Sequence, residues 1–370
     1  MTGELNKAIP VYEQWQQEYP SDPTPRTNLG NVYMNLGKFE ASLAQHRNAL
    51  RVEPNGVLIY ENLSLVYYNL NRFDDANEMV QAALARKMDD ANLHLMPVQI
   101  AFLKGDTATI EREMAWGMGK PGVEDAFLAT HADIEGAKGH VAKARELTRR
   151  AVDSAVRSGS KETAAFWLGL GALREVEVGN LAEATKEADA TLALAPNVYS
   201  QILAAITFAR AGKDRRASEI AYQLNRDRPL DTLVQSYWLP SIQAVLQLNR
   251  HDAAGAVQTL QATIPYELST EQPLDALYPV FERGQALLML HRGAEAAAEF
   301  QKALDHGTLV TFTSLSLVHL QLARAYAESK EVEKARSAYR DFLTLWQDAD
   351  SDNAIYVSAK AEYTKLKSNP

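Results

Sequence analysis

The sequence predicts an all-α solenoid of stacked helix pairs, and three observations support this prediction. First, the stretch "LGNVYMNLGKFEASLAQHRNAL" (residues 29–50) nearly returns as "LSLVYYNLNRFDDANEMVQAAL" (residues 63–84). Second, small and apolar residues recur at helical spacing along most of the chain. Third, no segment sustains the two-residue alternation of strand-forming residues that predicts a sheet. A fixed period between similar segments is the mark of a repeat array rather than of one globular core.

The offset between the two copies is 34 residues at every matching position. The identical pairs are Leu29 and Leu63, Val32 and Val66, Tyr33 and Tyr67, Asn35 and Asn69, Leu36 and Leu70, Phe39 and Phe73, Ala49 and Ala83, and Leu50 and Leu84. Because each repeat of such an array contacts only its neighbours, the length of 370 residues sets no count of ordinary domains.

The unit at 23–56 shows how one repeat is built. We expect a first helix, a turn at Gly37, and a second helix that ends at Pro54. Gly30 and Ala49 are small, so they allow the two helices to cross closely.

Other units keep this register with varying fidelity. Pro97 lies inside an expected first helix and should kink it or end it early. At the start of the chain only a second helix is recognisable, which suggests a fragment of a longer protein or an unusual native cap. We predict a partial repeat at 1–22, three repeats at 23–122 with the third degenerate, four partly degenerate repeats at 123–263, two repeats with long connecting loops at 264–346, and a C-terminal cap helix at 347–370.

Two joins are longer than helix–helix connections usually are, at 263–279 and 304–316. They are either binding loops or plugs that pack along the solenoid. Leu309, Val310 and Phe312 favour packing.

The 34-residue helix-turn-helix pattern resembles the tetratricopeptide repeat (TPR). This resemblance implies a right-handed superhelical solenoid whose first helices line a concave groove. The positions expected to face that groove are Thr27, Asn31, Met34, Asn35, Glu61, Leu65, Tyr68, Asn69, Leu95, Gln99 and Phe102.

The expected groove carries no cation, unlike the lysine and arginine clamp for a C-terminal carboxylate for which the family is best known. Apolar side chains such as Leu65 and Tyr68 alternate with amides such as Asn31 and Asn69. This mixture suits an extended peptide or a docked helix. The alternative is that the aromatic residues only pack against the adjacent helix.

From about residue 110 onward the chain also resembles the C-terminal repeat region of bacterial eukaryotic-like serine/threonine protein kinases. Similar tails follow winged-helix transcriptional regulators. In that family the array is a sensing or docking module behind a catalytic or DNA-binding domain, and this chain lacks that output domain. The resemblance rests on "MAWGMGKPGVED" (114–125), "RPLDTLVQSYWLPSIQA" (228–244), "IPYEL" (264–268), "YPVFERGQALLMLHRGAEAAAEFQKALDH" (278–306) and "HLQLARAYAESKEVEKARSAYRDFLTLWQDAD" (319–350).

We expect no catalytic, cofactor or metal site. A kinase glycine-rich loop, strand lysine and catalytic aspartates are missing. The phosphate-loop lookalike "GMGKPG" (117–122) has Pro121 where a Ser or Thr must bind magnesium. "SGSK" (158–161) and "SDN" (351–353) fit two motifs of penicillin-recognising enzymes, but the third is missing. His131 and Glu135 are four residues apart on an expected helix. A single His–Glu pair of this kind is more typical of a surface contact than of a metal site.

Composition bounds the partners and the location. The net charge of -9 argues against binding to nucleic acid or to an anionic membrane. No apolar run approaches the roughly 18 residues of a membrane span, and the first residues do not form a signal peptide. The absence of cysteine suits either redox environment. We therefore expect a soluble chain, in the bacterial cytoplasm or on the extracytoplasmic side if it is tethered to a missing membrane span.

The leading functional hypothesis is a non-catalytic scaffold that binds a protein or peptide. Two alternatives remain: the regulatory tail of a kinase or transcriptional regulator, and a small-molecule sensor that uses the solenoid interior.

Overall fold

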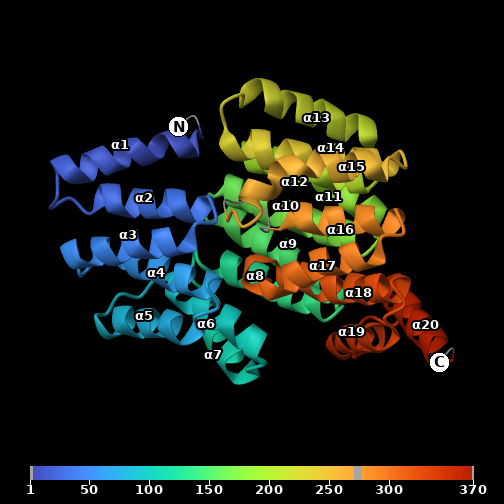
Figure 1. Ribbon diagram of the computed structural model, residues 1–370. Coiled ribbons are helices and arrows are strands. Elements are labelled where there is room, and N and C mark those ends of the chain that lie inside the picture. Colours follow the sequence, from blue (N-terminus) through green and yellow to red (C-terminus); the bar gives the residue numbers. More distant parts are fainter. Residues whose placement is uncertain (1–2, 271–276, 369–370) are drawn as a thin grey trace. The chain divides into compact units, whose positions relative to one another are not determined.

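The computed structural model describes residues 3–270 and 277–368. These residues form twenty α-helices, one π-helical turn and two short 3₁₀ segments, without any strand. The all-α prediction is therefore confirmed for the described chain, and the helices pack as consecutive antiparallel pairs (Figure 1). No described helix is both long and apolar enough to cross a bilayer.

The chain divides into two compact units, which we describe one at a time. Unit 1 holds the N-terminal residues up to Phe127 together with residues 230–232 and 268–270, and unit 2 holds the other described residues.

Unit 1 consists of one single helix followed by three helix pairs. Its helices are α1 (Leu5–Glu18), α2 (Thr24–Asn35), α3 (Phe39–Val52), α4 (Val57–Asn69), α5 (Phe73–Ala85), α6 (Ala91–Lys104) and α7 (Thr107–Gly117).

The core of unit 1 follows the repeat. Leu29, Leu63 and Leu93 come from the first helices α2, α4 and α6, and each is almost fully buried. Helix α4 packs against both α2 and α6, so the first helices form one layer. Polar caps start the third pair: the carboxylates of Asp90 and Asp106 accept backbone N–H groups in the first turns of α6 and α7.

Unit 2 begins inside α8 and holds the remaining pairs. Its helices are α8 (Glu124–Ala137), α9 (Val141–Arg157), α10 (Lys161–Glu177), α11 (Leu181–Leu194), α12 (Val198–Arg210), α13 (Asp214–Asp227), η1 (Val234–Trp238), α14 (Leu239–Asn249), α15 (Ala253–Thr259), η2 (Leu260–Tyr266), α16 (Tyr278–Met289), α17 (Gly293–Asp305), η3 (Gly307–Leu309), α18 (Phe312–Glu328), α19 (Val332–Leu345) and α20 (Ala354–Ser368).

The first helices of unit 2 pack in succession, α10 on α12, α12 on α14, α14 on α16 and α16 on α18. The array then closes on itself. The carboxylate of Asp133 in α8 accepts the backbone N–H groups of Phe312 and Thr313, at 2.7 and 3.2 Å, in the first turn of α18. The Thr313 hydroxyl also donates to this carboxylate, at 2.7 Å.

A second contact closes the outer side of unit 2. The backbone N–H of Asp350 donates to the carbonyl of Gly139, and the Asp350 carboxylate accepts the N–H of Ala142 at 3.0 Å. A Cβ at Gly139 would lie 2.8 Å from the indole of Trp346, so a glycine is required for this approach. The first pair, α8 and α9, therefore contacts the last pair, α18 and α19.

Two local expectations can be compared with the structure. Helix α6 does not end early at Pro97 but continues to Lys104. A proline removes one N–H from the helix, and the packing of the buried residues on both sides outweighs that loss. In the join at 304–316, Leu309 and Phe312 are buried, as the packing alternative predicts. Part of the join at 263–279 lies outside the described residues.

Candidate functional site

The expected groove residues of unit 1 lie on α2, α4 and α6, the layer of first helices. Met34, Glu61, Tyr68 and Asn69 are buried. The remaining positions are partly exposed, and these are Thr27, Asn31, Asn35, Leu65, Leu95, Gln99 and Phe102.

Tyr68 belongs to the packing within a repeat. It is 4% exposed, and its ring lies 5.8 Å from the ring of Phe73 at the start of α5. Leu65, one helical turn earlier, keeps a partly exposed side chain. Of these two apolar positions, Leu65 is therefore the one with solvent-exposed area.

A segment of unit 1 covers the C-terminal end of α2. The hydroxyl of Ser269 donates to the carbonyl of Asn35, and the hydroxyl of Thr270 donates to the carbonyl of Met34 at 3.2 Å. The last carbonyl groups of a helix lack intrahelical partners, so they are ready acceptors. Leu268 lies against Gly37, where a Cβ would come within 2.7 Å of the Leu268 side chain.

Three of the side chains expected to face the groove hold buried polar atoms without a hydrogen-bond partner among the described residues. They are Oδ1 of Asn31, Oε1 of Glu61 and Nδ2 of Asn69. The other oxygen of Glu61 accepts the amide of Asn92 at 3.2 Å. Burial, reinforced by the neighbouring Asp90 carboxylate, raises the pKa of Glu61 to about 7. Buried polar groups without partners are costly, so this face is incompletely satisfied.

The first helices of unit 2 bring a second set of polar residues together. Nη1 of Arg210 in α12 lies 2.6 Å from Oε1 of Glu282 in α16, and this Glu282 side chain is 1% exposed. The same Arg210 nitrogen lies 3.5 Å from the hydroxyl of Tyr278. In α10, Arg174 donates to the hydroxyl of Thr148 at 3.0 Å.

Glu177 ends α10 within this set. Its carboxylate oxygens accept the hydroxyl of Ser314 in α18, at 3.3 and 3.4 Å. Burial raises the pKa of Glu177 to about 7; the charges of Arg210 and Arg174 oppose this shift, and that of Asp133 adds to it. The ionised carboxylate is therefore only partly compensated by its surroundings.

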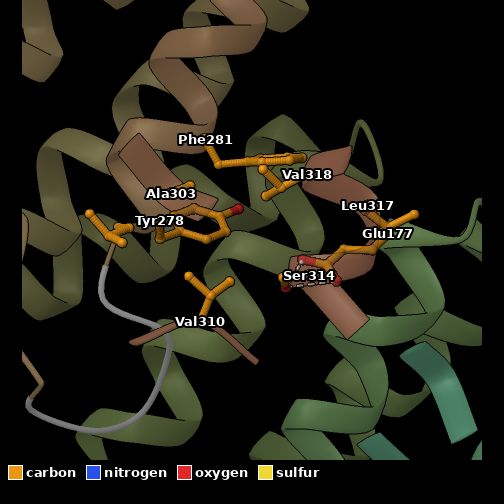
Figure 2. Close-up of a pocket in the computed structure, with 9 residues that line it drawn as sticks. Glu177, Tyr278, Phe281, Ala303, Val310, Ser314, Leu317 and Val318 are labelled. Atoms are coloured by element: carbon orange, nitrogen blue, oxygen red, sulfur yellow. Dashed lines mark hydrogen bonds between the residues drawn. The ribbon is translucent and has the colours of Figure 1, made fainter. Parts of the chain in front are cut away.

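A cavity of about 20 Å³ opens beside Glu177 (Figure 2). Figure 2 shows the rings of Tyr278 and Phe281 facing it, with Glu177 and Ser314 on another side. A space of this size holds one water-sized group. The lining residues are Glu177, Leu277, Tyr278, Phe281, Ala303, Val310, Ser314, Leu317 and Val318.

The structure shows the contacts of the segments that resemble a phosphate-binding loop and a metal-binding pair. In the turn between α7 and α8, Nζ of Lys120 lies 3.1 Å from the ring centre of Trp116. His131 and Glu135 do pair, at 3.6 Å, and Glu135 also accepts His140 at 2.7 Å. The contact with His131, followed by the hydrogen bond with His140, lowers the pKa of Glu135 to about 2. Among the described residues no group of three or more His, Asp or Glu side chains suits a metal ion.

The sequence analysis missed the polar residues in the interior of unit 2. They lie far apart along the chain, one or two in each helix, so no motif joins them. A usable signal exists in the helices themselves. Arg174, Glu175 and Glu177 follow a largely apolar stretch in α10, and Glu282 and Arg283 interrupt the apolar residues of α16. Charged residues in a buried helix face require partners, which points to an interior polar cluster.

Comparison with known proteins supports the repeat. Residues 30–71 match the TPR repeat family. No curated protein matches the chain in sequence at a significant level.

Solved structures match over most of the chain at low identity. Yeast Tom70 is 13% identical, with 98% of this chain and 92% of that chain covered and a TM-score of 0.44. Human IFIT1, solved as a dimer with m7Gppp-AAAA, is 15% identical, with 98% and 86% covered and a TM-score of 0.48. A tetratricopeptide repeat protein from Parabacteroides merdae is 13% identical, with 82% and 98% covered and a TM-score of 0.37. At such identities a likeness concerns the fold alone. The described residues form an all-α array of helix pairs, and within it residues 30–71 match the TPR repeat.

Proposed function

We propose that the chain is a non-catalytic scaffold that binds a protein or peptide on the α2, α4 and α6 face of unit 1. The observation that carries this proposal is the set of unsatisfied polar atoms on that face, in Asn31, Glu61 and Asn69. An extended peptide carries alternating backbone N–H and C=O groups. If the face opens slightly, a peptide N–H can donate to Oδ1 of Asn31 and a peptide carbonyl can accept from Nδ2 of Asn69.

The apolar part of the proposed site is Leu65 together with Phe102, which are partly exposed on neighbouring first helices. Truncated apolar anchors typically cost 1–2 kcal/mol of binding energy, or about a 5- to 30-fold loss of affinity. Since Ser269 and Thr270 already bind the carbonyl groups at the end of α2, we place the partner toward Asn31, Leu65 and Gln99.

A peptide-display selection on the full chain, followed by calorimetric titration of the selected peptide, tests the proposal. We expect Leu65→Ala to weaken binding by about 5- to 30-fold at nearly unchanged stability. We expect Tyr68→Ala mainly to lower the melting temperature, because Tyr68 is built into the packing with Phe73.

Lys213→Ala, an exposed change on a turn of unit 2, is the control and should alter neither quantity. A selected peptide that binds Leu65→Ala and Asn31→Ala as tightly as the unchanged chain places the binding surface elsewhere and refutes this assignment.

For the wider context we propose a sensing or docking module, either independent or belonging to a longer kinase or winged-helix regulator. The support is the resemblance of the segments at 114–125, 228–244, 264–268, 278–306 and 319–350. The net charge of -9 favours a protein partner over a nucleic acid. Sequencing the gene upstream of the Met1 codon separates the two contexts, since an in-frame kinase or winged-helix domain there identifies the regulator.

A further inference from the structure

The interior of unit 2 holds a small cavity with an unusual combination of walls. Most of its lining is apolar or aromatic, and the two polar side chains that line it besides Tyr278 are Glu177 and Ser314. The carboxylate comes from α10, the hydroxyl from α18 and the aromatic rings from α16, so three first helices of the closed array build the cavity (Figure 2).

The charges around this cavity do not balance when every group is ionised. Asp133, Glu177 and Glu282 contribute three negative charges, and Arg174 and Arg210 contribute two positive charges. Arg210 forms an ion pair with Glu282 at 2.6 Å, and Nη2 of Arg174 lies 3.8 Å from Oδ1 of Asp133. Among the described residues Glu177 has hydrogen bonds from Ser314 but no ion pair of its own.

One added positive charge beside Glu177 would balance the cluster. At low pH a proton on the Glu177 carboxyl group supplies this charge. The raised pKa of Glu177 means that the proton is held up to about pH 7. Above that pKa the ionised carboxylate, on a residue that is partly exposed, is only partly compensated by Arg210 and Arg174, and a bound cation would add to that compensation. The rings of Tyr278 and Phe281 favour a cation as well, because the face of an aromatic ring attracts positive charge.

The size of the cavity selects the kind of cation. About 20 Å³ accommodates one water-sized head group such as a primary ammonium, whereas the four heavy atoms of a guanidinium head exceed it. An alkyl chain on the ammonium therefore has to extend out of this space. An alkyl chain attached to the ammonium would meet Leu317, Val318 and Val310. A free carboxylate or phosphate ligand would face Glu177 and be repelled.

We propose that this cavity binds the primary ammonium group of a small alkylamine, with the Glu177 carboxylate and the Ser314 hydroxyl as acceptors and the Tyr278 and Phe281 rings as the apolar walls. Because the ligand contacts both α10 and α18, binding also strengthens the closure of unit 2. This inference concerns a different unit from the proposed peptide face and does not depend on it.

Ethylammonium chloride is the probe, with ethanol as the neutral ligand of the same number of heavy atoms and sodium chloride as the ionic-strength control. The full chain is titrated at pH 8 by ligand-observed NMR and by thermal shift. We expect ethylammonium to bind in the millimolar range, because a ligand of three heavy atoms cannot gain more binding free energy than that. Ethanol should bind at least tenfold more weakly. Between pH 6 and pH 8 the affinity for ethylammonium should rise, because the proton and the amine compete for Glu177.

Glu177→Gln keeps the shape of the side chain and the hydrogen bond with Ser314 while it removes the charge. It should weaken ethylammonium binding at least tenfold and abolish its pH dependence. Glu187→Gln is the matched control: burial also raises the pKa of Glu187 to about 7, but this residue does not line the cavity. Circular dichroism and melting curves establish that both variants are folded.

A blocked lysine, Nα-acetyl-lysine methylamide, distinguishes the source of the ammonium group. Tighter binding than ethylammonium assigns the cavity to the lysine side chain of a partner, and failure to bind assigns it to a free amine. Equal binding of ethanol and ethylammonium, or unchanged ethylammonium binding in Glu177→Gln, overturns the proposal.

Discussion

Gly30 in α2 lies directly against the imidazole of His46 in α3. A Cβ added at Gly30 would come within 2.6 Å of both Cε1 and Nε2 of that ring. His46 is fully buried, so it has no free space into which to move. The contact joins the two helices of one repeat, and it explains why position 30 holds the smallest residue.

Gly30→Leu should therefore separate α2 from α3 and destabilise unit 1. Overpacking of a filled core costs on the order of 1–3 kcal/mol, and we expect a value in this range from chemical denaturation. Ala44→Leu, on the exposed side of α3, adds the same side chain without a clash and serves as control. An unchanged unfolding midpoint for Gly30→Leu contradicts the described crossing.

His46 should remain neutral well below the usual pKa of histidine. Neither ring nitrogen has a hydrogen-bond partner among the described residues, and burial lowers the pKa of His46 to about 4. An unfolded chain takes up this proton near pH 6.5, so the contribution of His46 to stability is complete above that pH and is lost as the pH falls toward 4. Glu61 in the same unit acts in the opposite sense, since its pKa is raised.

An NMR titration of the imidazole resonances measures His46 directly and without that interference. The ring should titrate near pH 4. Protonation close to pH 6.5 in the folded protein would show that the imidazole is solvated or paired.

Asp133 should hold the closure of unit 2. Its carboxylate accepts two backbone N–H groups at the start of α18 and the hydroxyl of Thr313, and a negative charge is favourable at a helix N-terminus. Asp133→Ala leaves those donors without a partner and should cost about 1–3 kcal/mol. Hydrogen exchange of residues 312–318 should accelerate, whereas Asp153→Ala on α9 should leave it unchanged. Equal protection in both variants would mean that the closure does not depend on this carboxylate.

Glu187→Gln should stabilise unit 2 at alkaline pH. Burial, reinforced by the carboxylates of Glu175 and Glu183, raises the pKa of Glu187 from 4.5 to about 7. Because the pKa of Glu187 is raised in the folded chain, its contribution to the free energy of unfolding is complete below pH 4.5. This contribution is lost as the pH rises through 7. The neutral glutamine escapes this loss, and we expect a gain on the order of 1–3 kcal/mol at pH 8 with little difference at pH 4.5.

Thermal melts of Glu187→Gln at the two pH values measure this difference, and the exposed Glu219→Gln is the control. A variant less stable than the unchanged chain at pH 8 would show that the Glu187 carboxylate is effectively paired.

The chain should neither hydrolyse ATP nor transfer its phosphate. The lysine of the phosphate-loop lookalike, Lys120, packs over the ring of Trp116. A coupled-enzyme assay with magnesium should show no turnover above a no-protein blank. Saturable turnover that Lys120→Ala abolishes would contradict this expectation.

The sequence by itself determined the repeat and therefore the local architecture. The identical residues at an offset of 34, among them Leu29 with Leu63 and Phe39 with Phe73, set the positions at which helices begin, turn and pack. Such features depend on neighbours in the chain, which a sequence pattern records directly. The layer of first helices, on which the expected groove positions lie, could be predicted for the same reason.

Tertiary structure alone decided which of those positions are accessible and where the array closes. Tyr68 and Leu65 look equivalent as apolar groove residues, yet the contact with Phe73 buries Tyr68. Asp133 meets Thr313, and Glu177 meets Ser314, across separations of 180 and 137 residues. These contacts depend on the curvature accumulated over five helix pairs, and no periodicity in the sequence encodes a sum of small rotations between repeats.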